Sequence, residues 1–98
     1  MGTEYIKYKN FKPTDGLISI TQSMYDKIFT KSPRSSDVKF YIEKNGDIYS
    51  AYGTVDTSQG VFVGCSARDN PKVSIQEMGN RLASRLPLVR NRGGDDYF

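Results

Sequence analysis

The sequence contains no histidine and only one cysteine, Cys65, and these two shortages exclude most of the chemistry available to a small domain. Histidine is the commonest general base and metal ligand, and Ser–His and Cys–His nucleophiles both need it. Zinc sites built from thiolates and imidazoles are excluded as well. We therefore expect a protein that binds and does not catalyse, with no catalytic residue, no metal site and no cofactor.

Other familiar patterns are also missing. The glycines follow neither the Gly-x-x-x-x-Gly-Lys nor the Gly-x-Gly-x-x-Gly spacing that cradles phosphates, so we expect no small-molecule substrate. No stretch approaches the roughly 18 consecutive apolar residues of a membrane helix, and residues 1–5 show no signal-peptide pattern. A single cysteine forms no internal disulfide, which favours a reducing compartment. These absences predict a cytoplasmic protein with no membrane partner.

The chain has enough apolar residues for one core. It has 98 residues, of which 37% are hydrophobic and 26% charged. A second core would fall below the size at which chains usually fold alone. We expect one domain over residues 1–92, followed by a flexible polar tail over 93–98. Cys65 lies in an apolar run, and we expect its thiol to be buried and inert.

The hydrophobic period changes along the chain and predicts the elements. Segments that alternate with period two, typical of strands, are residues 5–9, 38–43, 48–55 and 61–67. Segments with apolar residues every three or four positions, typical of helices, are residues 17–31 and 71–86. Thr14 or Asp15 is expected to cap the first helix, and Asn70 and Pro71 to start the second. Asn45-Gly46 predicts a hairpin turn.

The element order is therefore β-α-β-β-β-α, an α+β fold. Both helices are expected on one face of a four-stranded sheet, which gives two layers. The other face is open to solvent or to a partner, and Lys39, Tyr41 and Glu43 suit it. Tyr41 and Tyr49 are candidates for stacking on RNA bases, although ordinary cross-strand packing is the favoured interpretation.

The charge distribution points to an anionic partner. The net charge is +3, and the segment from Lys72 to Arg92 contains five basic residues and one acidic residue. Arg81 and Arg85 are one helical turn apart, and guanidinium groups suit phosphate oxygens. The alternative is that both simply form the solvated edge of the helix. The candidate RNA-binding residues are Arg81, Arg85, Arg90, Arg92, Lys72, Lys27 and Lys31.

Three stretches resemble the short hibernation-promoting and ribosome-associated inhibitor family. They are VKFYI at 38–42, AYGTVDTSQGVFV at 51–63 and SIQEMGNRLASRL at 74–86. The joint order and spacing of these stretches carry the resemblance. The chain departs from the family's pattern at Lys72, where an aromatic residue is usual, and at Ser32-Pro33 and Pro87, which shorten the two helices.

The resemblance implies a fold like that of double-stranded-RNA-binding domains. It also implies a stress-response factor that binds small-subunit ribosomal RNA near the decoding centre and inhibits translation, and that is a monomer off the ribosome. Two alternatives stay open. One is a different RNA-binding module of similar fold, and the other is a protein-interaction module that uses the open sheet face or an edge strand.

Overall fold

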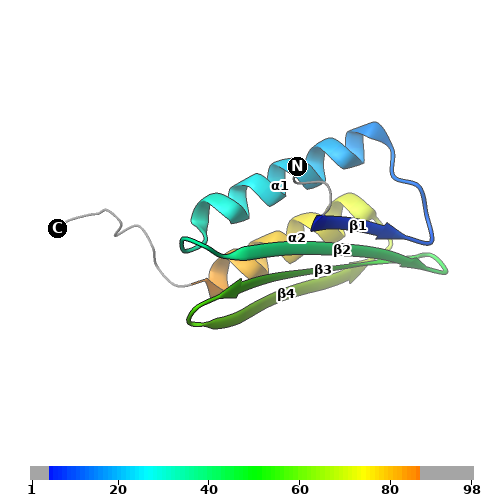
Figure 1. The fold of residues 1–98 in the computed structure, drawn as a ribbon. Coiled ribbons are helices and arrows are strands. Elements are labelled where there is room, and N and C mark those ends of the chain that lie inside the picture. Colours follow the sequence, from blue (N-terminus) through cyan, green and yellow to red (C-terminus); the bar gives the residue numbers. More distant parts are fainter. Residues whose placement is uncertain (1–4, 87–98) are drawn as a thin grey trace.

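Two helices lie side by side against one face of a four-stranded sheet (Figure 1). The structure is a computed structural model and describes residues 5–86. Its elements are β1 (Ile6–Lys9), α1 (Asp15–Lys31), β2 (Asp37–Asn45), β3 (Ile48–Thr57), β4 (Gly60–Arg68) and α2 (Pro71–Arg85). The predicted α+β class, the β-α-β-β-β-α order and the placement of both helices on one face are confirmed.

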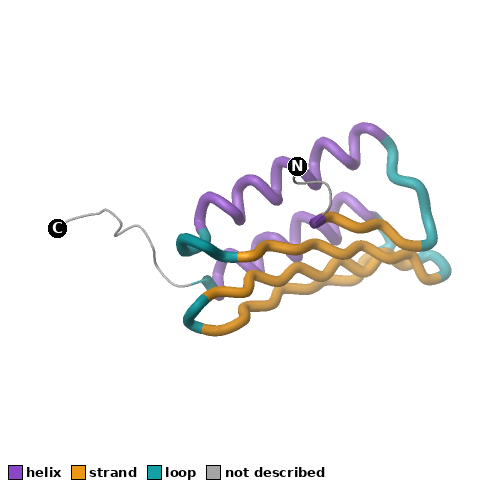
Figure 2. The backbone as a smooth tube through the Cα atoms, viewed as in Figure 1, coloured by secondary structure: helices purple, strands orange, loops and turns teal. Residues whose placement is uncertain are grey.

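The sheet order follows the chain order, β1-β2-β3-β4. β1 runs parallel to β2, and the other two pairings are antiparallel. Figure 2 shows short loops between β2, β3 and β4, whereas β1 and β2 are separated by the whole of α1. Because β1 and β4 are the edge strands, each has one row of backbone groups without a strand partner.

Turn chemistry fixes the two hairpins. Gly46 adopts a φ of 61°, as the predicted Asn-Gly turn requires. The second turn is shorter than the gap between the predicted strand segments 48–55 and 61–67, because β3 continues through Thr57 and β4 begins at Gly60. The Thr57 hydroxyl donates to the Gly60 carbonyl at 2.9 Å and accepts from the Gln59 amide at 2.9 Å. The Thr57 side chain thus closes the loop, while Thr57 itself remains part of strand β3.

The helix ends follow from caps visible in the sequence. Thr14 is the N-cap of α1, and its hydroxyl accepts from the Leu17 amide at 3.1 Å. Asn70 caps α2 by accepting from two backbone amides of the first turn. α1 ends at Lys31, before the Ser32-Pro33 pair. Neither helix has the length and hydrophobicity that a membrane span needs.

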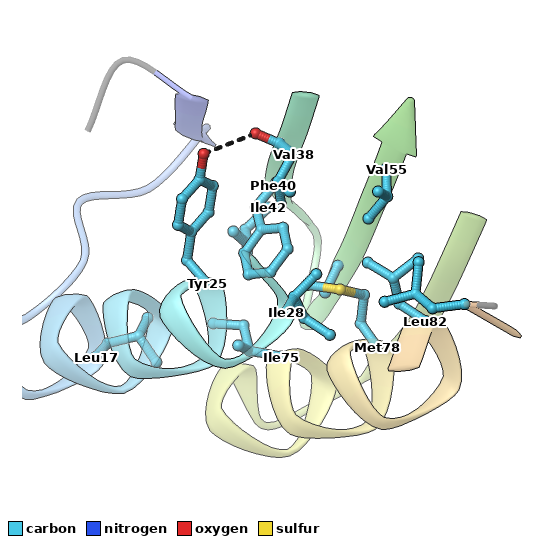
Figure 3. Packing of buried hydrophobic residues seen from close by; sticks show 12 residues of the cluster. Leu17, Tyr25, Ile28, Val38, Phe40, Ile42, Val55, Ile75, Met78 and Leu82 are labelled. Atoms are coloured by element: carbon cyan, nitrogen blue, oxygen red, sulfur yellow. Dashed lines mark hydrogen bonds between the residues drawn. The ribbon is translucent and has the colours of Figure 1, made fainter. Parts of the chain in front are cut away.

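The core lies between the helix layer and the sheet (Figure 3). Its fully buried hydrophobic side chains alternate along β2 and β3 and recur every three or four residues along the helices. The Tyr25 hydroxyl donates to the Val38 carbonyl at 2.9 Å, which ties α1 to β2. The core residues are Leu17, Tyr25, Ile28, Val38, Phe40, Ile42, Ala51, Val55, Ile75, Met78, Leu82 and Leu86.

Glycines let α2 approach the sheet closely. A Cβ atom at Gly64 of β4 would lie 2.7 Å from both the Leu82 amide nitrogen and the Met78 carbonyl oxygen. These are backbone atoms of α2 and cannot rotate away. The absence of a side chain at this position therefore sets the distance between α2 and β4. It also brings the flank of α2 within reach of the sheet edge.

Candidate nucleic-acid interface

Arg81 and Arg85 share one flank of α2, as their spacing predicts, and both reach over the edge of β4. The Arg81 guanidinium donates through Nη1 to the Cys65 carbonyl at 2.9 Å. The Arg85 guanidinium donates through Nη1 to the Val63 carbonyl at 3.0 Å. β4 is an edge strand, and these alternate carbonyls belong to its outer row. Each arginine therefore supplies the donor that a fifth strand would have supplied.

A third contact continues this arrangement toward the start of α2. Glu77 accepts from Arg68 Nε at 2.8 Å and from Arg68 Nη2 at 3.2 Å, a bidentate pair. The Ser66 hydroxyl donates to the same carboxylate at 2.7 Å. These bonds hold the pKa of Glu77 below its ordinary value, the Arg68 bond being the larger cause. We call the set formed by Arg68, Glu77, Arg81 and Arg85 the edge clasp.

The edge clasp has a direct structural consequence. A strand that pairs with an exposed edge needs its free carbonyls and amides. Side chains of α2 already occupy the carbonyls of Val63 and Cys65. An incoming strand must displace both guanidinium groups before it can pair there. The clasp thus opposes strand addition at β4, one of the two ways in which a protein-interaction module could have used this sheet.

The contacts with β4 leave most of the hydrogen-bond donors of Arg81 and Arg85 unused. A guanidinium group carries five N–H donors, and the contact with β4 uses one from each of Arg81 and Arg85. Both side chains are exposed. The remaining donors can bind phosphate oxygens, and a guanidinium that is already held loses less rotamer freedom on binding. The pair is therefore a preformed, solvent-facing cationic surface.

The other basic candidates lie apart from this pair. Lys72 is nine residues before Arg81, which places it about 180° around the helix axis. It lines a hollow of about 390 Å³ at the start of both helices, together with Phe11 and Tyr49. Lys27 lines a smaller hollow of about 260 Å³ with Met24 of α1 and Gln76 of α2. The structure thus separates residues that the sequence grouped.

The last three basic candidates are also not placed beside the arginine pair. Lys31 is exposed in the final turn of α1. Arg90 and Arg92 lie outside the described residues, as does the tail predicted over 93–98. Lys27 and Lys31 are one turn apart on α1, and Arg81 and Arg85 are one turn apart on α2, where β4 carbonyls also hold them in place. Arg81 and Arg85 remain the centre of the candidate interface, and the other five stay predictions.

The expectation of a buried Cys65 thiol is wrong. Cys65 is exposed, because the alternation of β4 places Gly64 and Ser66 on the helix side. For Tyr49 the favoured interpretation of ordinary packing is confirmed, since the residue lies on the helix side of β3 and its ring meets Phe11 edge-on at a centroid distance of 5.2 Å. Tyr52 stands on the open face instead, and strand parity from the buried Ala51 could have identified it.

Carboxylates and the cysteine do not form a metal site in this part of the molecule. Among residues 5–86, no three Asp, Glu or Cys side chains lie close enough to hold a metal ion.

No protein-family model and no curated sequence matches the chain. Among solved structures, a ribosomal subunit interface protein from Coxiella burnetii superposes with a TM-score of 0.68 at 10% identity, over 83% of this chain and 89% of that one. The N-terminal domain of Protein Y from Thermus thermophilus gives 0.66 at 16% identity, over 82% and 90%.

The chain shares the fold of both proteins. The match spans nearly all of each partner, so it covers the whole domain and not a common substructure. The resemblance drawn from residues 38–86 is confirmed at the level of the fold. At 10% and 16% identity, the comparison concerns the backbone, and the side chains must be argued from this chain alone.

Proposed function

We propose that this protein is a ribosome-associated factor of the hibernation type, which binds small-subunit ribosomal RNA near the decoding centre and inhibits translation. The observation that carries the proposal is the shared fold with a ribosomal subunit interface protein over 83% of the chain. Arg81 and Arg85 would contact the RNA backbone from the flank of α2. Lys27, Lys31, Lys72, Arg90 and Arg92 would add weaker contacts.

The geometry of the arginine pair supports RNA as the partner. Phosphate contacts need donors that are exposed, charged and fixed in position. Arg81 and Arg85 are exposed, and each is anchored by a carbonyl of β4. The two anchored guanidinium groups are one helical turn apart, so they form a short row of donors along one flank of α2. Catalysis forms no part of the proposal, and the factor would act in the cytoplasm as a monomer off the ribosome.

Sedimentation through a sucrose gradient tests the proposal. The protein should travel with small subunits at low salt and be released at high salt, because phosphate binding displaces counterions. The variant Arg81→Gln with Arg85→Gln should lose this association. It must first be shown to be folded by circular dichroism at the assay temperature, because both residues also contact β4.

A matched control distinguishes the effect of losing the arginine pair from the effect of losing two positive charges. Lys9→Gln with Arg34→Gln removes the same two charges from exposed positions outside the proposed set. This control should still sediment with small subunits. Wild-type protein that stays at the top of the gradient at low salt would rule the proposal out. Equal losses in the two double variants would show that net charge, and not the α2 pair, determines binding.

A further inference from the structure

The face of the sheet that the helices leave uncovered carries a shallow hollow of its own. Both helices lie on the other side, so this face is open to solvent (Figure 1). The hollow has a volume of about 510 Å³. Its side chains come from β1, β2, β3 and the residue before β1, and we call them the sheet-face patch: Tyr5, Lys7, Lys39, Tyr41, Tyr52 and Thr54.

Strand register places these side chains in two adjacent rows. Lys7 is opposite Tyr41, and Tyr41 is opposite Tyr52, which makes one row across three strands. Lys39 is opposite Thr54 in the next row. Directly opposed side chains in a sheet are about 5 Å apart. Two phenol rings therefore stand beside each other, with Lys7 next to Tyr41 in the same row and Lys39 next to Tyr41 in the adjacent row.

The rings are accessible, which ordinary packing would not require. Tyr5 is 40% exposed and Tyr52 is 46% exposed. Large aromatic side chains normally dominate cores because they bury so much area. Residues 5–86 contain no element that covers this face, as both helices pack on the opposite one. Tyr41 is half-buried, so Tyr52 offers the more accessible ring of the pair to solvent.

The positive charge of the sheet-face patch favours an anionic partner. Its side chains include two ammonium groups, and none is a carboxylate. Carboxylates lie only at the two ends of the strands: Asp37 opposes Asp56 at one end, and Glu43 opposes Lys9 at the other. An anionic chain is therefore attracted to the centre of the face and repelled from one end of it.

We propose that the sheet-face patch binds a short segment of single-stranded RNA. Unpaired bases would stack on Tyr52 and Tyr41, and the backbone phosphates beside them would contact Lys7 and Lys39. Accessible aromatic rings beside basic side chains suit unpaired nucleotides, since every base has a flat face and every linkage has a charge. A duplex hides its base faces and gains only the charge. The site lies on the opposite layer from the arginine pair and goes beyond the proposed function.

Fluorescence anisotropy of a labelled octanucleotide measures the affinity. The chain contains no tryptophan and seven tyrosines, so the part of the tyrosine quenching that is lost in Tyr52→Ala reports stacking on Tyr52. Single-stranded RNA should bind and quench, and a hairpin duplex should bind at least roughly tenfold more weakly, because stacking on one base contributes about five- to 150-fold. Single-stranded DNA of the same sequence shows whether the 2′-hydroxyl contributes. A poly-glutamate peptide of equal charge tests an acidic protein as the occupant.

Two sets of variants test the two kinds of contact. Tyr52→Ala should weaken binding roughly five- to 150-fold, whereas Tyr52→Phe should retain it because the ring remains. Lys7→Gln with Lys39→Gln should lower the slope of log affinity against log salt by about 1.4, since each single-strand phosphate contributes about 0.7. The lysine pair is exposed, so this second test stands even if a tyrosine variant folds poorly.

Matched controls come from the helix layer. Phe29 on α1 is a 56% exposed aromatic residue, and Phe29→Ala should leave affinity unchanged. Lys12→Gln with Arg34→Gln, at exposed positions in the loops before and after α1 and outside both proposed sites, should do the same. Equal binding of the hairpin or of poly-glutamate, equal losses in these controls, or an unchanged salt slope in the lysine pair would each overturn the proposal. Sedimentation of the wild-type protein with ribosomes does not depend on any of these outcomes, so the two proposals fail separately.

Discussion

The edge clasp should stabilise the fold, and replacing Arg81 and Arg85 measures by how much. The substitution Arg→Met at both positions removes the charge and the donors but keeps an apolar stem. A hydrogen bond to a charged group contributes about 1.5–3 kcal/mol when it is shielded from water. Both side chains are exposed, and exposed charged contacts contribute less, so we expect about 1 kcal/mol for each.

The loss for the pair should therefore be about 2 kcal/mol. For a domain of this size, each kcal/mol corresponds to a shift of the melting temperature by roughly 4–8 °C, which gives about 8–16 °C. Urea denaturation followed by circular dichroism measures the free energy of unfolding. The matched control is Arg34→Met in the loop between α1 and β2, where an exposed substitution should change stability by less than about 0.5 kcal/mol.

A double variant as stable as the Arg34→Met control would refute the reasoning. It would mean that the contacts at 2.9 and 3.0 Å do no more than water does at the same carbonyls. Removal of the guanidinium groups should also expose the edge of β4. Size-exclusion chromatography should then show concentration-dependent association of the double variant and not of the control, because free strand edges pair with one another.

Three further predictions concern other contacts of the fold. Gly64→Ala should cost about 3 kcal/mol in urea denaturation, because its Cβ would meet backbone atoms of α2, whereas Gly79→Ala should cost less, because it meets only the flexible Met24 side chain. Glu77 should make stability depend on pH: its pKa is lowered in the folded state, so its contribution is complete above the ordinary glutamate pKa of about 4.3 and is lost as pH falls through the folded value. The Glu77→Gln variant should lack this dependence in acid titrations. Tyr25→Phe should cost about 1–2 kcal/mol in thermal melts by leaving a buried carbonyl of β2 without its donor.

The fold could be predicted from the sequence because each element is determined locally. The change of hydrophobic period separates strands from helices, and Thr14, Asn70 and Gly46 mark ends and turns by their own chemistry. Several boundaries moved by one or two residues, and the one at Thr57 depends on a side-chain bond to Gly60 across the loop. Such a bond forms only once the hairpin has closed, so the pattern of residues does not reveal it.

The candidate site could be predicted only in part, since it depends on which elements become neighbours. The spacing of Arg81 and Arg85 predicts a shared flank of α2, but the contact with β4 needs the strand order and the close approach at Gly64. The same limit affected the tyrosines of β3. Tyr49 and Tyr52 are three residues apart, so they face opposite sides of the sheet. Which of the two faces solvent is known only once the buried residues of β3 are known.

The contact with β4 explains why arginine suits positions 81 and 85 in both roles. A lysine ammonium is a compact point charge on a flexible stem, and it cannot hold a carbonyl with one edge while presenting a second edge to a phosphate. The planar guanidinium does both, and its orientation is fixed before the ligand arrives. The Cys65 carbonyl that anchors Arg81 belongs to the residue opposite Tyr52, so the arginine pair borders the sheet-face patch at β4. Cys65 itself carries no charge, so the two surfaces stay separate. The edge clasp closes the β4 edge to protein strands, and the guanidinium donors that β4 does not use stay available to phosphate.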